Sequence, residues 1–140
     1  MDVSVNYLAV LLAALSTMVV GSLWYSPSGF YKQWARLAHV KRTETNTKQM
    51  ILMFGGVFVA SLVMAVILAH MAYLSNTFFK NSFLQDTLST AFWLWLGFVA
   101  TRFYVHDTFE GRRKLLTVLN AGHELVTLLV MAIIIGLMGY

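Results

Sequence analysis

The chain has no cysteine, a single proline and little charge, and these shortages narrow the classes of protein that it can be. Without cysteine it can form no disulfide, no thiolate nucleophile and no cysteine-ligated zinc or iron–sulfur site. Charged residues make up only 11% of its 140 residues, against about 25% in an ordinary soluble domain. A soluble domain of this length leaves much of its surface in water and could not hide so many apolar side chains.

Apolar sequence is abundant instead: hydrophobic residues make up 59% of the chain, and the mean hydropathy is +0.69. This composition excludes a soluble globular enzyme, a disordered chain and a nucleic-acid-binding module. The long apolar runs at residues 5–25, 50–74, 83–104 and 115–140 can each cross a bilayer, which takes about 20 residues. The sequence therefore predicts an all-α integral membrane protein, a single domain over residues 1–140 with a bundle of four transmembrane helices.

The Lys and Arg residues predict how this bundle is oriented. No Lys or Arg precedes Lys32, so the first run lacks the basic start of a signal peptide and is expected to be a retained span. Of the ten basic residues, Lys80 alone lies between the second and third runs. The others lie beside the other two connections: Lys32, Arg36, Lys41, Arg42, Lys48, Arg102, Arg112, Arg113 and Lys114. The positive-inside rule then predicts that these two connections are cytoplasmic and both termini are outside, in the plasma (inner) membrane.

A short amphipathic helix is predicted at residues 29–39, within the first basic connection. Phe30, Trp34 and Leu37 share one face of this helix, and Trp24 and Tyr25 precede it at the end of the first span. Aromatic side chains favour the membrane–water interface, so we interpret these residues as interfacial anchors at the cytoplasmic surface. The alternative is a docking surface for lipid or a partner.

Small residues recur every four positions on two of the predicted spans. They let helix backbones approach closely in lipid, where no hydrophobic force drives helices together. Such stripes can serve packing within the bundle, which we favour, or contacts between subunits, and we expect a homo-oligomer, most simply a dimer. The stripes comprise Ala9, Ala13, Thr17 and Gly21 on the first span and Ser61, Ala65 and Ala69 on the second.

Polar side chains form a stripe on the fourth span, where few are expected. Glu124 lies roughly 14 Å from the start of this span, near the bilayer midplane. An ionised carboxylate there costs several kcal/mol unless it is paired or faces water. Arg102 is the one basic residue expected to reach inward, although it lies closer in depth to Asn120 than to Glu124. The stripe comprises Thr117, Asn120, Glu124 and Thr127, with His123 beside it.

This intramembrane polar site has two readings that the sequence leaves open. Glu124 and His123 could form a proton relay, an ion site or an acid–base pair, since ionisable residues inside a membrane are usually functional. Alternatively, Glu124 and Asn120 only hydrogen-bond to a neighbouring helix. A weaker candidate lies in the last loop, where His106 and Glu110 have a spacing that can hold a metal. We favour a capping box formed by Asp107 and Glu110, and predict no metal site and no cofactor.

Several local strings occur together in an order that resembles a known family. They are Asn-Tyr-Leu-Ala-Val at 6–10, Leu-Trp-Tyr-Ser-Pro at 23–27, Trp-Leu-Gly-Phe-Val-Ala at 95–100, Phe-Glu-Gly-Arg at 109–112 and Asn-Ala-Gly at 120–122. The chain resembles the small four-helix membrane proteins grouped as domain of unknown function 1761. The resemblance implies four transmembrane helices and no established activity. His123 and Glu124 depart from it, because that family is expected to have an aromatic or neutral polar pair there.

Three functional hypotheses follow from these features. The first is a small oligomeric transporter or channel whose path is lined by Asn120, His123 and Glu124, with an ion or small molecule as its substrate. The second is a structural or regulatory membrane partner that acts through its interfacial helix and small-residue stripes. The third is a membrane enzyme that acts on a lipid-soluble substrate, with Glu124 and His123 as acid and base. The lipid bilayer is the one partner common to all three, and none involves nucleic acid.

Overall fold

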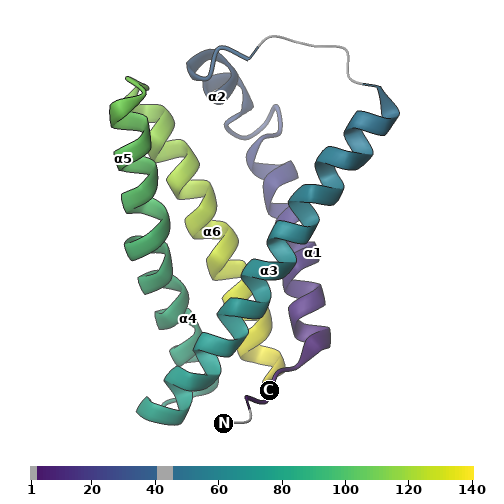
Figure 1. Cartoon of the computed structure of the whole chain (residues 1–140), viewed down its shortest axis with the longest axis vertical. Coiled ribbons are helices and arrows are strands. Elements are labelled where there is room, and N and C mark those ends of the chain that lie inside the picture. Colours follow the sequence, from purple (N-terminus) through teal and green to yellow (C-terminus); the bar gives the residue numbers. More distant parts are fainter. Residues whose placement is uncertain (1–2, 41–45) are drawn as a thin grey trace.

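The computed structural model describes residues 3–40 and 46–140, and every regular element within these ranges is a helix. The elements are α1 (Tyr7–Trp24), α2 (Tyr31–Leu37), α3 (Thr47–Phe79), α4 (Phe83–Leu94), η1 (Trp95–Ala100), α5 (Thr101–Phe109) and α6 (Lys114–Met138) (Figure 1). In the described part of the chain, four helical segments are long and apolar enough to cross a membrane, with α4, η1 and α5 together forming one of them. The predicted all-α class and four spans are confirmed, and the chain is a multi-pass helical membrane protein.

The helix ends follow from local capping residues. The Asn6 side chain caps α1 by accepting a hydrogen bond from the Ala9 amide at 3.1 Å. Ser82 caps α4 by accepting a hydrogen bond from the Gln85 amide. The second span is longer than the predicted 50–74, because Asn46 and Gln49 form a capping box that starts α3 at Thr47. Lys41 and Arg42 of the first basic connection lie outside the described residues.

The third span contains a π-helix, which the sequence did not predict. Six residues, Trp95–Ala100, adopt this wider helix between α4 and α5. A π-helical turn shifts the side chains that follow it around the helix axis, and such turns are frequent at functional sites. Side chains of η1 and α5 line the candidate site described below.

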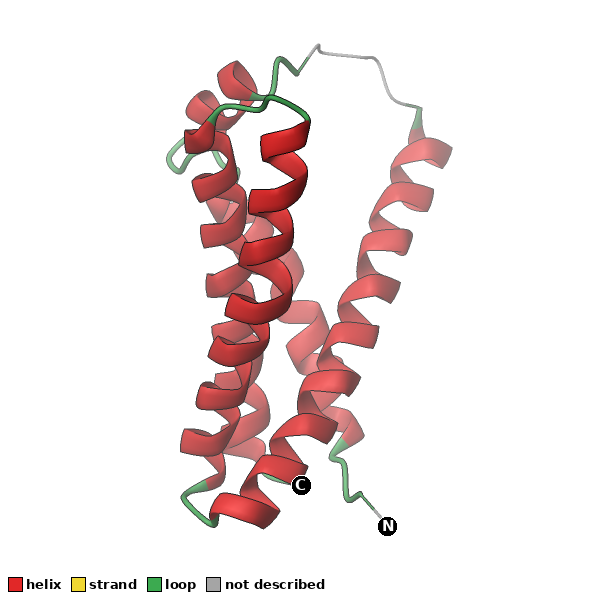
Figure 2. Ribbon diagram, turned by 60° about the vertical axis from the view of Figure 1, so that its left-hand side comes forward, coloured by secondary structure: helices red, strands yellow, loops and turns green. Residues whose placement is uncertain are grey.

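The helices define two ends of the molecule, which both views show (Figures 1 and 2). The terminal end holds the two chain termini and the turn between α3 and α4. The basic end holds α2, the loop between α5 and α6, and the first turns of α3; its basic residues include Lys32, Arg36, Lys48, Arg112, Arg113 and Lys114. The helix α3 leans away from α1, α5 and α6 as it approaches the basic end.

The core lies in the half of the bundle nearest the terminal end and consists largely of alanine. The small-residue stripes face inward, and their packing within the chain is evident from burial of Ala9, Ala13, Ala65 and Ala69. Small side chains permit the close approach of α1, α3, α4 and α6. The helices α4 and α6 approach closely at Gly136, where an added Cβ would lie 2.8 Å from the Leu84 Cα of α4.

One buried polar contact links α1 to α3 within this core. The Thr17 hydroxyl donates a hydrogen bond to Ser61 Oγ at 2.9 Å, and Ser61 donates to the Val57 carbonyl at 2.9 Å. Gly21, the last member of the first stripe, instead faces α6, where its missing Cβ would lie 3.7 Å from His123 Nε2. The two stripes are thus used inside the protomer and are not free for a second subunit.

The half nearest the basic end is packed differently. Here α2 folds against α6 through a separate cluster of Leu37, Leu116 and Leu119, with Trp34 partly buried beside it. The start of α3, residues 47–57, is exposed in the described structure, and Met50, Ile51, Leu52, Met53 and Phe54 are 46–67% exposed. The helix α2 confirms that the short segment is helical, whereas its position at a membrane surface stays a prediction.

Candidate functional site

Glu124 lines a cleft on the α3 side of α6. We call this hollow, which has a volume of about 540 Å³, the basic-end cleft. Glu124 follows the start of α6 by about 15 Å of helix, so the cleft reaches from the basic end toward the middle of the bundle. Its wall is formed by four elements and the loop between α5 and α6: Met64, Phe98, Val99, Arg102, Phe103, His106, Asp107, Glu110, Arg112 and Glu124.

The other members of the polar stripe on α6 do not share this cleft. The Thr117 hydroxyl donates to Asp107 Oδ2 on α5 at 2.6 Å. Asn120 turns toward α1, where its Oδ1 accepts a hydrogen bond from the Tyr25 hydroxyl at 3.4 Å. Thr127 is buried deeper in the bundle, and its hydroxyl has no partner among the described residues. The residues of the predicted stripe therefore do not face one common site.

His123 lies on α6 between the end of α1 and Glu124 in the cleft. Its Nδ1 lies 3.4 Å from Glu124 Oε1, and its side chain is only 15% exposed. The ring packs against Tyr25 at 5.0 Å and against Trp24 at 5.9 Å between centroids. The remaining ring nitrogen, Nε2, is buried without a hydrogen-bond partner among the described residues, as is Trp24 Nε1. The structure thus places a histidine–glutamate pair between an aromatic cluster and an open cleft.

That aromatic cluster contains the residues predicted as interfacial anchors. Trp24 packs on Phe30 at 4.6 Å and Tyr25 on Trp34 at 5.1 Å between ring centroids. The turn between α1 and α2 is tight enough to require Gly29, because an added Cβ would lie 2.6 Å from the Trp24 carbonyl oxygen. The cluster therefore holds α2 against the end of α1 and against α6. Anchoring in the membrane interface remains a prediction for these side chains.

Arg102 lines the cleft without a carboxylate partner in the described part of the chain. Its Nη2 lies 3.0 Å from His106 Nε2, one turn further along α5. The ion pairs among the described residues do not include it, so the strained pairing of Arg102 with Glu124 that the sequence allowed is not formed. A guanidinium that remains charged in proteins therefore faces the cleft with its charge unbalanced.

The two carboxylates at the mouth of the cleft are paired. Asp107 is only 4% exposed; besides Thr117, it has Arg112 Nε at 3.8 Å from its Oδ1. Glu110 Oε2 lies 2.6 Å from the same Arg112 Nε. The predicted capping box of Asp107 and Glu110 is wrong, because α5 continues to Phe109 and the N-cap of α6 is Arg113. Among the described residues no group of three metal-ligating side chains occurs. Asp107 and Glu110 instead contact Arg112 of the loop between α5 and α6.

Sequence reasoning missed two polar contacts. The Trp95 indole donates to the Ala121 carbonyl oxygen of α6 at 2.8 Å, which ties η1 to the segment beside Glu124. A tryptophan in an aromatic band gives no signal of this bond. At the terminal end, Asp86 accepts hydrogen bonds from Asn76 at 2.7 Å and Asn81 at 2.9 Å. The two asparagines beside the turn at Lys80 were the available signal for this contact, which closes the α3–α4 turn.

The comparison with protein families agrees with the residues and the fold. The family described as "Protein of unknown function (DUF1761)" matches residues 8–136. The match covers nearly the whole chain, and the chain belongs to this family. Neither a curated protein nor a solved structure gives a significant match.

Proposed function

We propose that this DUF1761 protein is a small transporter in which Glu124 binds a proton or a cation that is carried across the membrane. One observation carries the proposal: Glu124 lines the basic-end cleft, and its carboxylate has no ion pair with Arg102. A carboxylate that served only to join helices would be expected to bond to the facing helix. Ionisable side chains that face a cavity within a membrane typically mark ion or proton pathways.

The contrast between the two halves supports transport rather than a permanently open pore. The cleft extends along α6 from the basic end, whereas the opposite half is filled by side chains such as Ala13, Ala65 and Met131 with 0% exposure. In an alternating-access transporter, each state opens the binding site to one side of the membrane and closes it to the other. The cleft and the filled half match one such state. We infer that the other state would loosen the contact of α3 with the terminal half.

Several groups face Glu124 and would tune its proton. His123 is the nearest, and Tyr25 packs on the His123 ring from α1. Across the cleft lie Arg102 and His106 of α5, and Asp107 of the same helix lies at the mouth. The histidine can accept a proton from Glu124 or donate one to it, since histidine is the side chain whose charge changes near neutral pH. This pair is the proposed entry point for proton coupling.

The oligomeric part of the proposal rests on the exposed start of α3, residues 47–57. Apolar side chains there are exposed on all faces, and an added Cβ at Gly55 or Gly56 would meet nothing within 4 Å. A second copy packed on this half would bury it and add a wall beside the cleft. We therefore propose a homodimer, with molecular mass in lipid nanodiscs as the test. A mass equal to one chain at every protein concentration would contradict it.

The basic end is proposed to face the cytoplasm of the plasma (inner) membrane, with both termini outside. Cysteine accessibility can test this orientation because the chain has no natural cysteine. Gln33→Cys lies on exposed α2 and Thr77→Cys on the exposed last turn of α3. In intact cells an impermeant thiol reagent should label Thr77→Cys and spare Gln33→Cys. The reverse labelling would overturn the orientation.

Flux measurements in proteoliposomes test the transport proposal. The protein should move protons or monovalent cations between pH 5 and 8, read by a pH-sensitive dye inside the vesicles. Glu124→Gln keeps the shape of the side chain but cannot ionise, so we expect flux at the level of empty vesicles. Glu124→Asp retains a carboxylate and should retain measurable flux. Equal flux in the wild type and Glu124→Gln would remove Glu124 from the pathway.

A further inference from the structure

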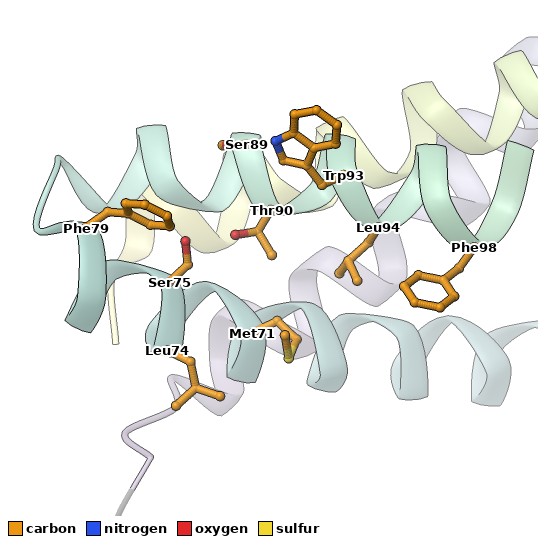
Figure 3. Close-up of a pocket in the computed structure, with 9 residues that line it drawn as sticks. All are labelled: Met71, Leu74, Ser75, Phe79, Ser89, Thr90, Trp93, Leu94 and Phe98. Atoms are coloured by element: carbon orange, nitrogen blue, oxygen red, sulfur yellow. The ribbon is translucent and has the colours of Figure 1, made fainter.

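A second hollow joins the basic-end cleft along the same side of α3. This lateral hollow, of about 480 Å³, lies between α3 and the helix formed by α4 and η1 (Figure 3). Thr90, Leu94 and Phe98 point from that helix toward α3, where Met71 and Ser75 face them. Phe98 also lines the basic-end cleft. The two hollows therefore share Phe98 as a wall and follow one another along the space between α3 and the third span, which we call the groove.

The groove is apolar at one end and charged at the other. None of the side chains that line the lateral hollow is ionisable, and its polar members are the hydroxyls of Ser75, Ser89 and Thr90 and the Trp93 indole. The basic-end cleft, by contrast, holds Arg102, His106, Asp107, Glu110, Arg112 and Glu124. This polarity matches a molecule with a charged head and an apolar chain rather than a uniformly polar solute.

The sign of the unbalanced charge indicates what head group would bind. Glu110 and Asp107 share Arg112, and Glu124 lies beside His123. Arg102 has no such partner among the described residues, and only His106 lies near its guanidinium. An anionic oxygen would complete this pair of nitrogen groups, because arginine is well suited to phosphate recognition.

The length and exposure of the groove indicate where the molecule comes from. From Arg102 to Thr90 the third span rises by about 18 Å, which is close to the roughly 15 Å depth of one leaflet of the hydrocarbon core. Trp93 and Phe98 are 64% and 73% exposed, so the groove is open along its length to the surface that lipid covers. The basic residues at this end would also attract anionic lipids of the adjacent leaflet.

We propose that the groove between α3 and the third span binds one anionic phospholipid of the bilayer, with its phosphate at Arg102 and His106 and an acyl chain in the lateral hollow. This site can be tested separately from the transport proposal, because it uses Arg102, His106 and the apolar wall, whereas the transport proposal rests on the Glu124 carboxylate. The bound lipid would cover the side of the basic-end cleft that faces the membrane.

Native mass spectrometry can test this site. The protein is released from nanodiscs made of equal parts phosphatidylglycerol and phosphatidylcholine, and the masses of retained lipids are compared. We expect the wild type to retain the anionic lipid preferentially, and Arg102→Gln to lower that preference about tenfold, the effect of losing one hydrogen bond between charged partners. Arg102→Lys keeps the charge but loses the planar fork, so it should lower the preference less than Arg102→Gln does.

Matched controls separate this site from general attraction to basic residues. Lys32→Gln removes one charge from exposed α2 at the same end and should leave the preference unchanged. Leu94→Trp fills the lateral hollow and should lower retention of both lipids, whereas Leu96→Trp, on the same helix but outside both hollows, should not. Unfolding temperatures close to the wild type would show that each variant is folded.

Three outcomes would overturn the lipid site. They are an equal loss of preference in Arg102→Gln and Lys32→Gln, retention of phosphatidylcholine as readily as phosphatidylglycerol, and retention of a free fatty acid instead of a phospholipid. Glu124→Gln removes a negative charge from the wall of the cleft and keeps Arg102 and His106, so retention of the anionic lipid should not fall. Failure of the flux experiment with intact lipid retention would therefore reject the transport proposal alone, and the converse result would reject the lipid site alone.

Discussion

In the half of the bundle near the chain termini the four spans contact one another through alanines, whereas in the basic half they separate around a cleft. Both halves are apolar in composition, and the difference lies in whether small residues face a neighbouring helix. Ala9, Ala13, Ala65, Ala91 and Ala132 are each 0% exposed in the terminal half. In the basic half α3 diverges, and an added Cβ at Gly55 or Gly56 would meet nothing within 4 Å. Since lipid supplies no hydrophobic force between helices, close packing depends on small residues that face another helix.

The two halves also differ in how they accommodate polar groups. In the terminal half, the Thr17–Ser61 contact is enclosed between helices. In the basic half, Glu124 and Arg102 line an open cleft without pairing with each other. The closed half can therefore act as a rigid frame, whereas the open half holds the ionisable side chains of the candidate site. Each prediction below compares a variant in one half with a matched variant in the other or at an exposed site, with stability measured by unfolding in mild detergent.

Large-to-small substitution in the closed half should have the largest effect. Met131 and Leu68 fill the core at 0% and 1% exposure. Replacing either with Ala should lower the free energy of unfolding by about 2–5 kcal/mol, through lost contacts and a residual cavity. Met53→Ala, at a side chain that is 55% exposed within one chain, should change it by less than about 0.5 kcal/mol at protein concentrations where the proposed dimer is dissociated. A loss at Met53 comparable to that at Met131 under these conditions would show that the start of α3 is packed within the single chain.

Adding a single methyl group at the close contact between α4 and α6 should have the next largest effect. In Gly136→Ala the new Cβ would lie 2.8 Å from a backbone atom of Leu84, so α4 and α6 must move apart. We expect a loss of about 1–3 kcal/mol from overpacking. Gly56→Ala serves as the control, because its Cβ meets nothing within 4 Å and alanine favours the helix. If Gly136→Ala is as stable as the wild type, α4 and α6 do not approach this closely.

Removal of the buried hydroxyl contact should have a smaller effect. Thr17→Val keeps the shape of the side chain but breaks the hydrogen bond to Ser61 on α3. Hydrogen bonds between membrane helices average about 0.6 kcal/mol, so we expect a loss of that order. Thr77→Val is the control, since the exposed Thr77 hydroxyl bonds only to the Tyr73 carbonyl of its own helix. An equal loss in both variants would indicate that the effect comes from valine in a helix and not from the α1–α3 contact.

The sequence predicted the closed half well and the open half poorly, for physical reasons. Long apolar runs and small residues at four-residue spacing depend only on local periodicity, and both placed the spans and the inward faces of α1 and α3. Helical spacing also placed Asn120, Glu124 and Thr127 on one stripe, but it could not show that Asn120 faces Tyr25, that Glu124 lines a cleft and that Thr127 is buried without a partner among the described residues. The divergence of α3 beside the cleft, the π-helix and the Trp95–Ala121 bond leave no local signal in the sequence.

The smallest effect on stability is expected at Arg102, which lines the cleft of the open half. Because this guanidinium has no carboxylate partner among the described residues, Arg102→Gln should change the free energy of unfolding by less than about 0.5 kcal/mol. Asp107→Asn is the matched charge change on the same helix. Asp107 is buried and accepts from Thr117 at 2.6 Å, so weakening this charged hydrogen bond should cost about 1–2 kcal/mol. A loss at Arg102 as large as that at Asp107 would mean that Arg102 is paired in the membrane, with Glu124 as the partner to test by a double-mutant cycle.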